Sequence, residues 1–332
     1  MSLYPSAKLL GTLFKKEGDL ELKPTRDGFG TGLVKAGEKN KNVVALCADL
    51  TESTRTQAFA EKFPARFFEC GVAEQNMACV AAGLAISGKI PFIASYAAFS
   101  PGRNWEQIRT TVAYNNANVK IAGHHAGISV GPDGATHQMT EDIALMRAMP
   151  NMTVIVPCDA VEAEKAVLAA AHIVGPVYIR FAREKSPVFT TIASPFTPGK
   201  AQIVWESHKP QVVVIACGPL LYNAIQAARL LERENIQSVV VNVHTIKPLD
   251  EKKITDLAKK YGAVVTVEEH QVAGGLGGAV AELLARTHST PMEFIGMHNV
   301  FGSSGSPEKL SAKYGMDVPS IIMAAKKAAL RK

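Results

Sequence analysis

Residues 150–180 read PNMTVIVPCDAVEAEKAVLAAAHIVGPVYIR and contain one complete strand–helix–strand pattern. The apolar runs at 153–156 and 177–180 predict buried strands, because their apolar residues are largely continuous rather than alternating with polar ones. Between them, the alanine-rich segment 160–172 predicts a helix that Asp159 can cap. Two strands joined by a helix favour a parallel sheet covered by helices.

The same alternation continues in both directions from this unit. Toward the N-terminus we expect strands at 43–48, 91–95 and 119–123, and helices at 74–87, 104–114 and 141–149. Toward the C-terminus, past a stretch rich in Pro, Ser and Thr, we expect strands at 212–217, 238–243, 264–268 and 292–295, and helices at 221–233, 251–261, 278–286 and 319–330.

This alternation predicts an α/β protein with two doubly wound domains, each built on a mostly parallel sheet. A length of 332 residues agrees with two domains. We expect an N-terminal extension at 1–22, a first domain at 23–189, a linker at 190–209 and a second domain at 210–332.

Composition and charge exclude several classes of protein. With 47% hydrophobic and 20% charged residues, the chain has an ordinary globular composition. The net charge is +6, but the lysine pairs are dispersed along the chain. Because nucleic-acid binding needs concentrated basic residues, we expect none here. No apolar run reaches 18 residues, so we expect no membrane span. Five cysteines without CxxC spacing favour reduced thiols and a cytoplasmic protein.

Two segments carry more chemistry than an ordinary turn requires. Residues 122–142, AGHHAGISVGPDGATHQMTED, place three histidines, Asp133 and four glycines in a loop ahead of a helix. Residues 70–77, CGVAEQNM, put Glu74 at the start of an apolar helix, where the helix dipole alone would favour a carboxylate. No HExxH, paired Cys/His or GxSxG pattern occurs, so the chain predicts no metal site of its own.

Four motifs in register resemble the C-terminal half of transketolase. They are ADLTES at 48–53, GVAEQNM at 71–77, GPDGATHQ at 131–138 and PNMTVIVPCD at 150–159, and the resemblance runs from about Lys23 to the end of the chain. In that family this half comprises a pyrimidine-binding domain and a C-terminal domain.

The resemblance also implies a cofactor and a partner. In the family, thiamine diphosphate lies between the pyrimidine-binding domain and a diphosphate-binding domain, whose Gly-Asp-Gly…Asn motif holds Mg²⁺ and the diphosphate. This sequence contains no such motif. The resemblance therefore implies one subunit of a split transketolase that is active with an N-terminal diphosphate-binding subunit, around a homodimer core in a heterotetramer.

The resemblance assigns roles to individual residues. Glu74 matches the glutamate that hydrogen-bonds the aminopyrimidine and relays a proton, whereas the cofactor itself is the main base. Tyr96 and Phe99 lie where the family has aromatics around that ring, with Trp105 as a candidate for a third. Asp49 resembles a residue of the interface near the cofactor.

A second group of residues matches positions that face the substrate. His125, Asp133 and His137 match positions that contact the sugar, and both histidines are candidates for moving its hydroxyl protons. The positions that hold the terminal phosphate are matched by Arg26, Ser53 and Arg183, with His125 assisting. Arg180 lies three residues before Arg183 in the sequence and is the alternative candidate for the same role.

The resemblance implies transfer of a two-carbon ketol unit from a ketose phosphate, such as xylulose 5-phosphate, to an aldose phosphate, such as ribose 5-phosphate. This is a reaction of the pentose phosphate pathway. Two alternatives share the cofactor, a deoxyxylulose-phosphate-synthase-like enzyme and a 2-oxo acid dehydrogenase β-type subunit. A third alternative is a non-catalytic regulatory subunit that keeps the fold.

Overall fold

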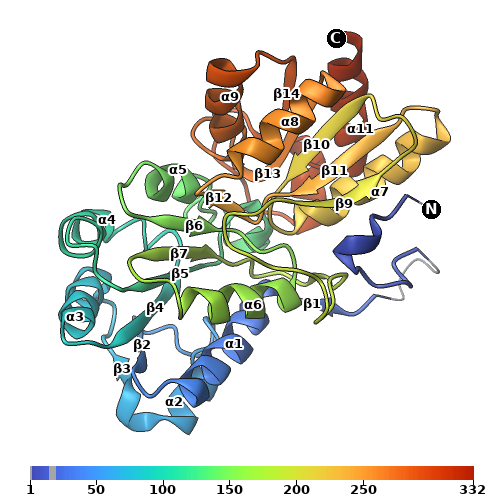
Figure 1. The fold of residues 1–332 in the computed structure, drawn as a ribbon. Coiled ribbons are helices and arrows are strands. Elements are labelled where there is room, and N and C mark those ends of the chain that lie inside the picture. Colours follow the sequence, from blue (N-terminus) through green and yellow to red (C-terminus); the bar gives the residue numbers. More distant parts are fainter. Residues whose placement is uncertain (1, 15–19) are drawn as a thin grey trace.

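The computed structural model describes residues 2–14 and 20–332, and two sheets divide them into two layered α/β units (Figure 1). The first sheet has seven described strands in the order β12-β6-β7-β5-β4-β2-β3. Their bounds are β2 Val43–Cys47, β3 Phe67–Glu69, β4 Ile90–Tyr96, β5 Lys120–His124, β6 Thr153–Ile155, β7 Val177–Arg180 and β12 Thr245–Lys247. All neighbouring pairs are parallel except β12 with β6.

Helices cover both faces of this sheet. They are α1 Thr25–Lys39, α2 Gln57–Lys62, η2 Pro64–Arg66, α3 Glu74–Ile86, α4 Trp105–Gln107, η3 Ile108–Ala113, η4 Ile128–Asp133, α5 Asp142–Arg147 and α6 Ala160–Ala170. Strand β2 explains the continuous apolar pattern, because all five of its residues are buried. Val43 and Ala45 pack with α1 and α6, whereas Val44 and Leu46 pack in the cluster that includes α3 and α5.

The second sheet has the order β14-β13-β10-β11-β9, with β9 antiparallel to β11 and the other pairs parallel. Its strands are β9 Gln202–Glu206, β10 Val212–Ala216, β11 Ser238–Asn242, β13 Val264–Gln271 and β14 Met292–Met297. Its helices are α7 Leu220–Arg233, α8 Glu251–Tyr261, α9 Leu276–Thr287, α10 Pro307–Lys313 and α11 Val318–Leu330. The predicted fold class, two α/β domains with mostly parallel sheets, is confirmed.

Three short elements tie the N-terminal segment to the rest of the molecule. Strand β1 (Leu22–Lys23) pairs with β8 (Ser186–Pro187), and η1 (Pro5–Ala7) lies near β9. The Tyr4 N–H donates to the Val204 carbonyl, 3.0 Å away, so the N-terminus lies beside β9 (Figure 1). Of the predicted N-terminal extension 1–22, residues 1 and 15–19 lie outside the described residues.

The two units share buried structure. Strand β12 follows β11 of the second sheet in sequence but joins the first sheet, where Thr245 pairs with Ile155. One apolar cluster runs from Met77 and Ile121 in the first unit to Val213 and Leu283 in the second. The domains are therefore held together by a strand and a continuous core.

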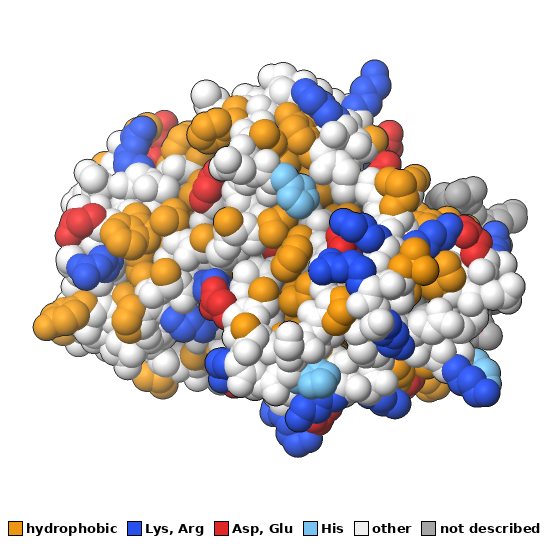
Figure 2. Space-filling model, turned by 90° about the horizontal axis from the view of Figure 1, so that it is seen from above, with side chains coloured by type: hydrophobic (Ala, Val, Ile, Leu, Met, Phe, Trp, Pro, Cys, Tyr) orange, Lys and Arg blue, Asp and Glu red, His pale blue; other side chains and the backbone are white. Residues whose placement is uncertain are grey.

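Two surface properties complete the description. On the face shown in Figure 2, acidic and basic side chains are interspersed with apolar ones. None of the helices in the part of the chain that the structure describes has the length and apolar character needed to cross a membrane.

Candidate functional site

The candidate residues from the sequence gather at the carboxyl edge of the first sheet. Strands β2, β4, β5 and β7 are parallel neighbours, so their carboxyl ends lie at one edge. Strand β4 ends at Tyr96, and His125 directly follows β5. Strand order reverses at β2, which has β3 on one side and β4 on the other. Open α/β sheets bind ligands in the crevice at such a reversal.

Four of the predicted residues form one aromatic cluster. The Tyr96 ring stacks on the His125 imidazole with centroids 3.7 Å apart and an interplanar angle of 20°. Phe99 is nearly parallel to Tyr96, with centroids 5.8 Å apart and an angle of 15°. His137 lies edge-on to Phe99 at 5.7 Å. The end of β4 and the loop 125–137 thus build an aromatic wall that can receive a flat ring.

Glu74 is the first residue of α3, and its side chain is only 2% exposed. Among the described residues, the one polar contact of its carboxylate is Arg103 Nη1, 3.5 Å from Oε2. The Arg103 guanidinium also lies 5.7 Å from the Phe99 ring centroid. Asn104 Nδ2 donates to the Glu74 carbonyl oxygen at 3.0 Å. The carboxylate is therefore buried beside the aromatic wall and retains capacity to accept hydrogen bonds.

Sequence reasoning missed Arg103 and Asn104. They follow β4 in an irregular segment, and no spacing rule connects that segment to the start of α3. Trp105, the candidate for a third aromatic, packs on the core cluster that contains Met77, Ile108 and Met149.

Arg26 joins the first turn of α1 to the loops after β2 and β5. Its Nη1 donates to the Ser53 carbonyl oxygen at 2.9 Å and lies 3.5 Å from His125 Nε2. Ser53 therefore contacts Arg26 through its backbone. Arg55, which the sequence analysis did not single out, pairs with Asp27 at 2.8 Å beside this arginine. Arg26 Nε is buried and has no hydrogen-bond partner among the described residues.

His125 is neutral at physiological pH. Burial, reinforced by Arg26, lowers its pKa to about 3. A guanidinium only donates, so Nε2 is the acceptor facing Arg26, and the ring proton is assigned to Nδ1. Within the described residues Nδ1 is buried without a partner. His125 therefore offers a hydrogen-bond donor that no described residue accepts.

Arg183 and Asp133 form the other side of the site. Arg183 Nη1 donates to the Val130 carbonyl oxygen at 2.9 Å and lies 3.7 Å from Asp133 Oδ1. Its side chain is 31% exposed, so it can meet a solute. Arg180, the alternative of the sequence analysis, is 5% exposed and pairs with buried Asp142 at 2.8 Å. The structure places Arg183 at the edge of the site and Arg180 in the interior.

Asp49 lies in the loop that follows β2. Its backbone N–H donates to Glu69 Oε1 at 2.6 Å, and Thr51 Oγ1 donates to Glu69 Oε2 at 2.7 Å. Glu69 thus anchors the loop, and Asp49 itself is exposed. This location next to the reversal of strand order leaves Asp49 accessible to a ligand or a second chain.

Two family models match the chain. "Transketolase, pyrimidine binding domain" covers residues 23–188, and "Transketolase, C-terminal domain" covers residues 199–321. Together they include both sheets and every predicted site residue.

Individual relatives agree with these matches. A Methanocaldococcus jannaschii protein is named "Putative transketolase C-terminal section". It is 45% identical to this chain over 90% of this chain and 94% of its own length. A 6-deoxy-6-sulfo-D-fructose transketolase subunit from a Clostridium species is 38% identical over 92% of this chain and 95% of its own. The chain spans 48% of the length of the mouse, rat and human proteins that it matches.

A solved structure has the same fold over most of the chain. It is described as a split gene transketolase in an inactive beta4 tetramer, and it superposes with a TM-score of 0.86 at 44% identity. The superposition covers 92% of this chain and 98% of that one.

Proposed function

The chain belongs to the transketolase family, and from this premise we propose that it binds the aminopyrimidine of thiamine diphosphate and the sugar substrates, and works with a separate diphosphate-binding subunit. The observation that carries the proposal is the continuous group of Arg26, His125, Tyr96, Phe99 and His137 at the carboxyl edge of the first sheet, with Glu74 buried beside it.

The residues present suit one part of the cofactor. Glu74 is buried with a single long polar contact among the described residues, next to the nearly parallel rings of Tyr96 and Phe99. A flat aminopyrimidine that donates hydrogen bonds fits such a place. When bound, thiamine diphosphate supplies a carbon nucleophile that cleaves and forms bonds next to a carbonyl.

A partner is needed for the metal and the diphosphate. No group of three or more His, Cys, Asp or Glu side chains in residues 2–14 and 20–332 could hold a metal ion. The sequence also lacks the family's Gly-Asp-Gly…Asn motif. We assign Mg²⁺ and the diphosphate to the partner subunit, with Asp49 near the interface, in a heterotetramer of two copies of each chain.

The chain's own residues position the cofactor and its proton. Glu74 accepts a hydrogen bond from a ring nitrogen and holds the proton there, while Arg103 limits the movement of its carboxylate. Tyr96 and Phe99 fix the plane of the ring. When the ring is held in this way, the reacting atoms are already placed correctly. No other protein group is then needed at the reacting carbon.

Substrate recognition divides between two ends of the sugar. His125 donates from Nδ1 to a sugar oxygen. His137, at the edge of the aromatic wall, hydrogen-bonds the sugar carbonyl or an adjacent hydroxyl. Asp133 accepts from a hydroxyl. Arg26 and Arg183 bind the terminal phosphate, with Ser53 and His125 nearby, because guanidinium groups make bidentate bonds to such anions.

The reaction we propose is transfer of a two-carbon ketol unit from a ketose phosphate, such as xylulose 5-phosphate, to an aldose phosphate, such as ribose 5-phosphate. A sulfonate at the end of the sugar, as in the substrate named for one relative, is also an anion and would suit the same arginines. The choice of anion is therefore part of the test.

The test measures ketol transfer with the chain alone and with the diphosphate-binding subunit from the same source. Each reaction contains Mg²⁺ and thiamine diphosphate, and each donor is offered separately: xylulose 5-phosphate, 6-deoxy-6-sulfofructose and pyruvate. We expect activity only in the mixture and only with a ketose donor.

Other outcomes contradict specific parts of the proposal. Activity of the chain alone would remove the need for a partner. Turnover of pyruvate in place of a ketose would favour the deoxyxylulose-phosphate-synthase-like or 2-oxo acid dehydrogenase alternative. An assembled complex that binds the cofactor but turns over none of the donors would favour a regulatory subunit.

A further inference from the structure

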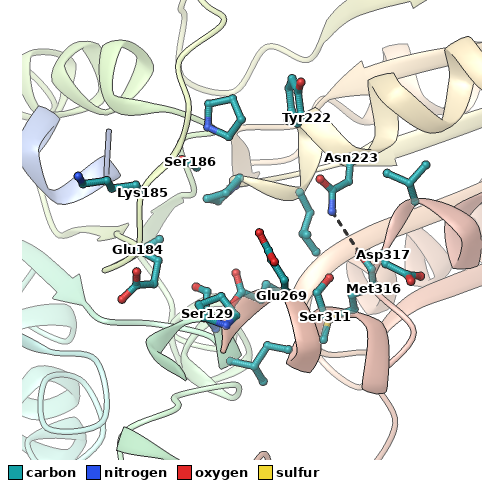
Figure 3. A pocket seen from close by; sticks show the side chains of 18 of the residues that line it. Ser129, Glu184, Lys185, Ser186, Tyr222, Asn223, Glu269, Ser311, Met316 and Asp317 are labelled. Atoms are coloured by element: carbon teal, nitrogen blue, oxygen red, sulfur yellow. Dashed lines mark hydrogen bonds between the residues drawn. The ribbon is translucent and has the colours of Figure 1, made fainter. Parts of the chain in front are cut away.

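A cavity of about 450 Å³ lies between the two domains, beside the segment that carries Glu184 and Lys185 (Figure 3). Ser129, Ala182 and Glu184 line it from the first domain, and these residues flank Val130 and Arg183 of the candidate site. The second domain contributes the start of α7, Glu269 of β13, part of α10 and the start of α11. A volume of this size is in the range of small-molecule sites.

The walls of this cavity are mainly apolar. Ile128 and Pro187 come from the first domain, and Leu220, Met316 and Val318 come from the second. Leu220 and Met316 are buried. Such a lining favours an occupant with a compact apolar body.

One carboxylate is directed into this apolar space. Glu269 is 7% exposed, and Figure 3 shows its side chain pointing into the cavity. The Ser129 N–H donates to Oε1, whereas Oε2 has no hydrogen-bond partner among the described residues. Gly127 allows this approach, because a Cβ there would lie 2.4 Å from Oε1. The second oxygen of this carboxylate is available to a donor in the cavity, and Ser311 Oγ is buried without a described partner.

The charge of the lining separates this cavity from the sugar site. Glu184, Glu269, Glu308 and Asp317 line it, with Lys185 as the one basic residue among its lining. Glu184 pairs with Arg183, Asp317 caps α11 through the Ser320 N–H, and Glu308 is exposed to solvent, so Glu269 is the buried carboxylate left for an occupant. This lining would repel a sugar phosphate, whereas the candidate site presents arginines.

We propose that this interdomain cavity is a second ligand site, for a small molecule that joins an apolar body to a positively charged amine. The amine donates to Glu269 Oε2, and the body lies against Leu220, Met316 and Val318. Because both domains supply walls, an occupant holds the domains together and contacts the backbone that positions Arg183.

The test uses calorimetric titration of the full chain with three probes of similar shape: phenethylamine, phenethyl alcohol and phenylacetate. We expect the amine to bind about tenfold or more tightly than the alcohol, because hydrogen bonds to charged groups are the stronger ones. Phenylacetate should bind most weakly. The amine should also raise the thermal unfolding midpoint of the chain.

Three variants locate the site. Glu269→Gln keeps an acceptor for Ser129 and should reduce the preference for amine over alcohol to about one. Asn223→Trp places a large ring at the partly exposed rim and should weaken both probes about tenfold or more. Asn115→Trp, on a different surface, is the matched control and should change neither affinity.

Several results would overturn the proposal. It is wrong if the amine binds no more tightly than the alcohol, or if Asn223→Trp leaves amine binding intact. It is equally wrong if folded Glu269→Gln keeps the preference for the amine. If Glu269→Gln does not fold, the ranking of the three probes and the result with Asn223→Trp still test the proposal.

Discussion

The chemistry of the candidate site depends on a few contacts between single side chains. Arg26 orients His125, Arg103 contacts Glu74, and the Val130 carbonyl holds Arg183. Each contact joins residues far apart in sequence. Substitutions at these positions therefore test function more directly than they test the fold.

Glu74→Gln tests the proton-holding role of the buried carboxylate. The amide keeps the size of the side chain but cannot hold a proton at the aminopyrimidine in the same way. We expect kcat of the assembled enzyme to fall about 100-fold or more. Thermal unfolding should change little, and exposed Glu61→Gln is the matched control. Undiminished turnover would remove Glu74 from the mechanism.

Arg183→Lys tests phosphate recognition. Lysine keeps the charge but loses the bidentate geometry, so KM for a phosphorylated donor should rise about tenfold. A ketose without the phosphate, such as erythrulose, should show an unchanged KM, which controls for general damage to the site. Equal effects on both donors would mean that Arg183 does not bind the phosphate.

Among the secondary-structure elements, α1 and α6 determine where Arg26 lies. A Cβ at Gly28 would come 2.1 Å from the Ala160 carbonyl oxygen and 2.8 Å from Ala163 Cβ. The helices therefore pack with their backbones close together, two residues from Arg26.

Gly28→Ala should force these helices apart. We expect a loss of about 1–3 kcal/mol in the free energy of unfolding, measured in urea, and weaker binding of phosphorylated donors. Gly83→Ala, at an exposed position of α3, is the matched control, because nothing lies within 4 Å of its added Cβ. That change should stabilise the isolated chain by about 0.5–1 kcal/mol. Equal effects of the two changes would contradict the packing argument.

The crossover from β11 to β12 contains a buried histidine. His244 Nδ1 lies 2.9 Å from Thr245 Oγ1, and Nε2 is buried without a described partner. Burial lowers its pKa from 6.5 to about 4. Between these values the unfolded chain binds a proton that the folded chain does not, so this histidine costs stability as the pH falls below 6.5 and has no effect above it.

His244→Gln should therefore reduce the loss of stability on acidification. Between pH 7.5 and 4.5 the variant should lose about 2–3 kcal/mol less than the wild type, measured by urea unfolding at each pH. Buried Glu162 and Glu268, whose pKa values burial raises to about 7, act in the opposite direction but are common to both proteins. Exposed His298→Gln is the control, and identical pH profiles for His244→Gln and the wild type would contradict the prediction.

At the scale of the whole molecule, a buried polar network joins the two domains. Asp142 Oδ2 accepts from Arg180 Nε at 2.8 Å and from the Tyr178 hydroxyl at 2.6 Å. Arg180 Nη2 donates to the Glu269 carbonyl oxygen of β13 at 2.8 Å. The interior of the first domain and the wall of the interdomain cavity therefore belong to one network.

Removing one member of this network should destabilise the molecule. Arg180→Met leaves the Asp142 carboxylate buried without its cation, and we expect a loss of about 3–5 kcal/mol in the free energy of unfolding. The double variant Arg180→Met with Asp142→Leu should recover part of this loss, because the unpaired charge is gone. A double variant less stable than the single one would contradict this prediction and would mean that the other contacts of Asp142, such as the hydrogen bond from Tyr178, outweigh its unpaired charge.

Much of the fold follows from the local sequence pattern. Continuous apolar runs such as 43–47 and 212–216 predict strands covered on both faces, and Asp159 caps α6 as expected through the Glu162 N–H. Helix α1 and strand β12 were not predicted. Helix α1 carries four glycines, which weaken a helical pattern, and β12 has only three residues. Their structure depends on packing against other elements.

The sequence by itself determined the α/β architecture, the resemblance to transketolase and the position of Glu74 at the start of a helix, because these depend on residue order and local periodicity. Only the tertiary structure decided that Arg183 rather than Arg180 reaches the edge of the site, that Arg103 contacts Glu74, and that a carboxylate lines the interdomain cavity. Periodicity reports whether a residue is buried, not which distant residue it meets. That choice follows from strand order, which brings the ends of β2, β4, β5 and β7 to one edge.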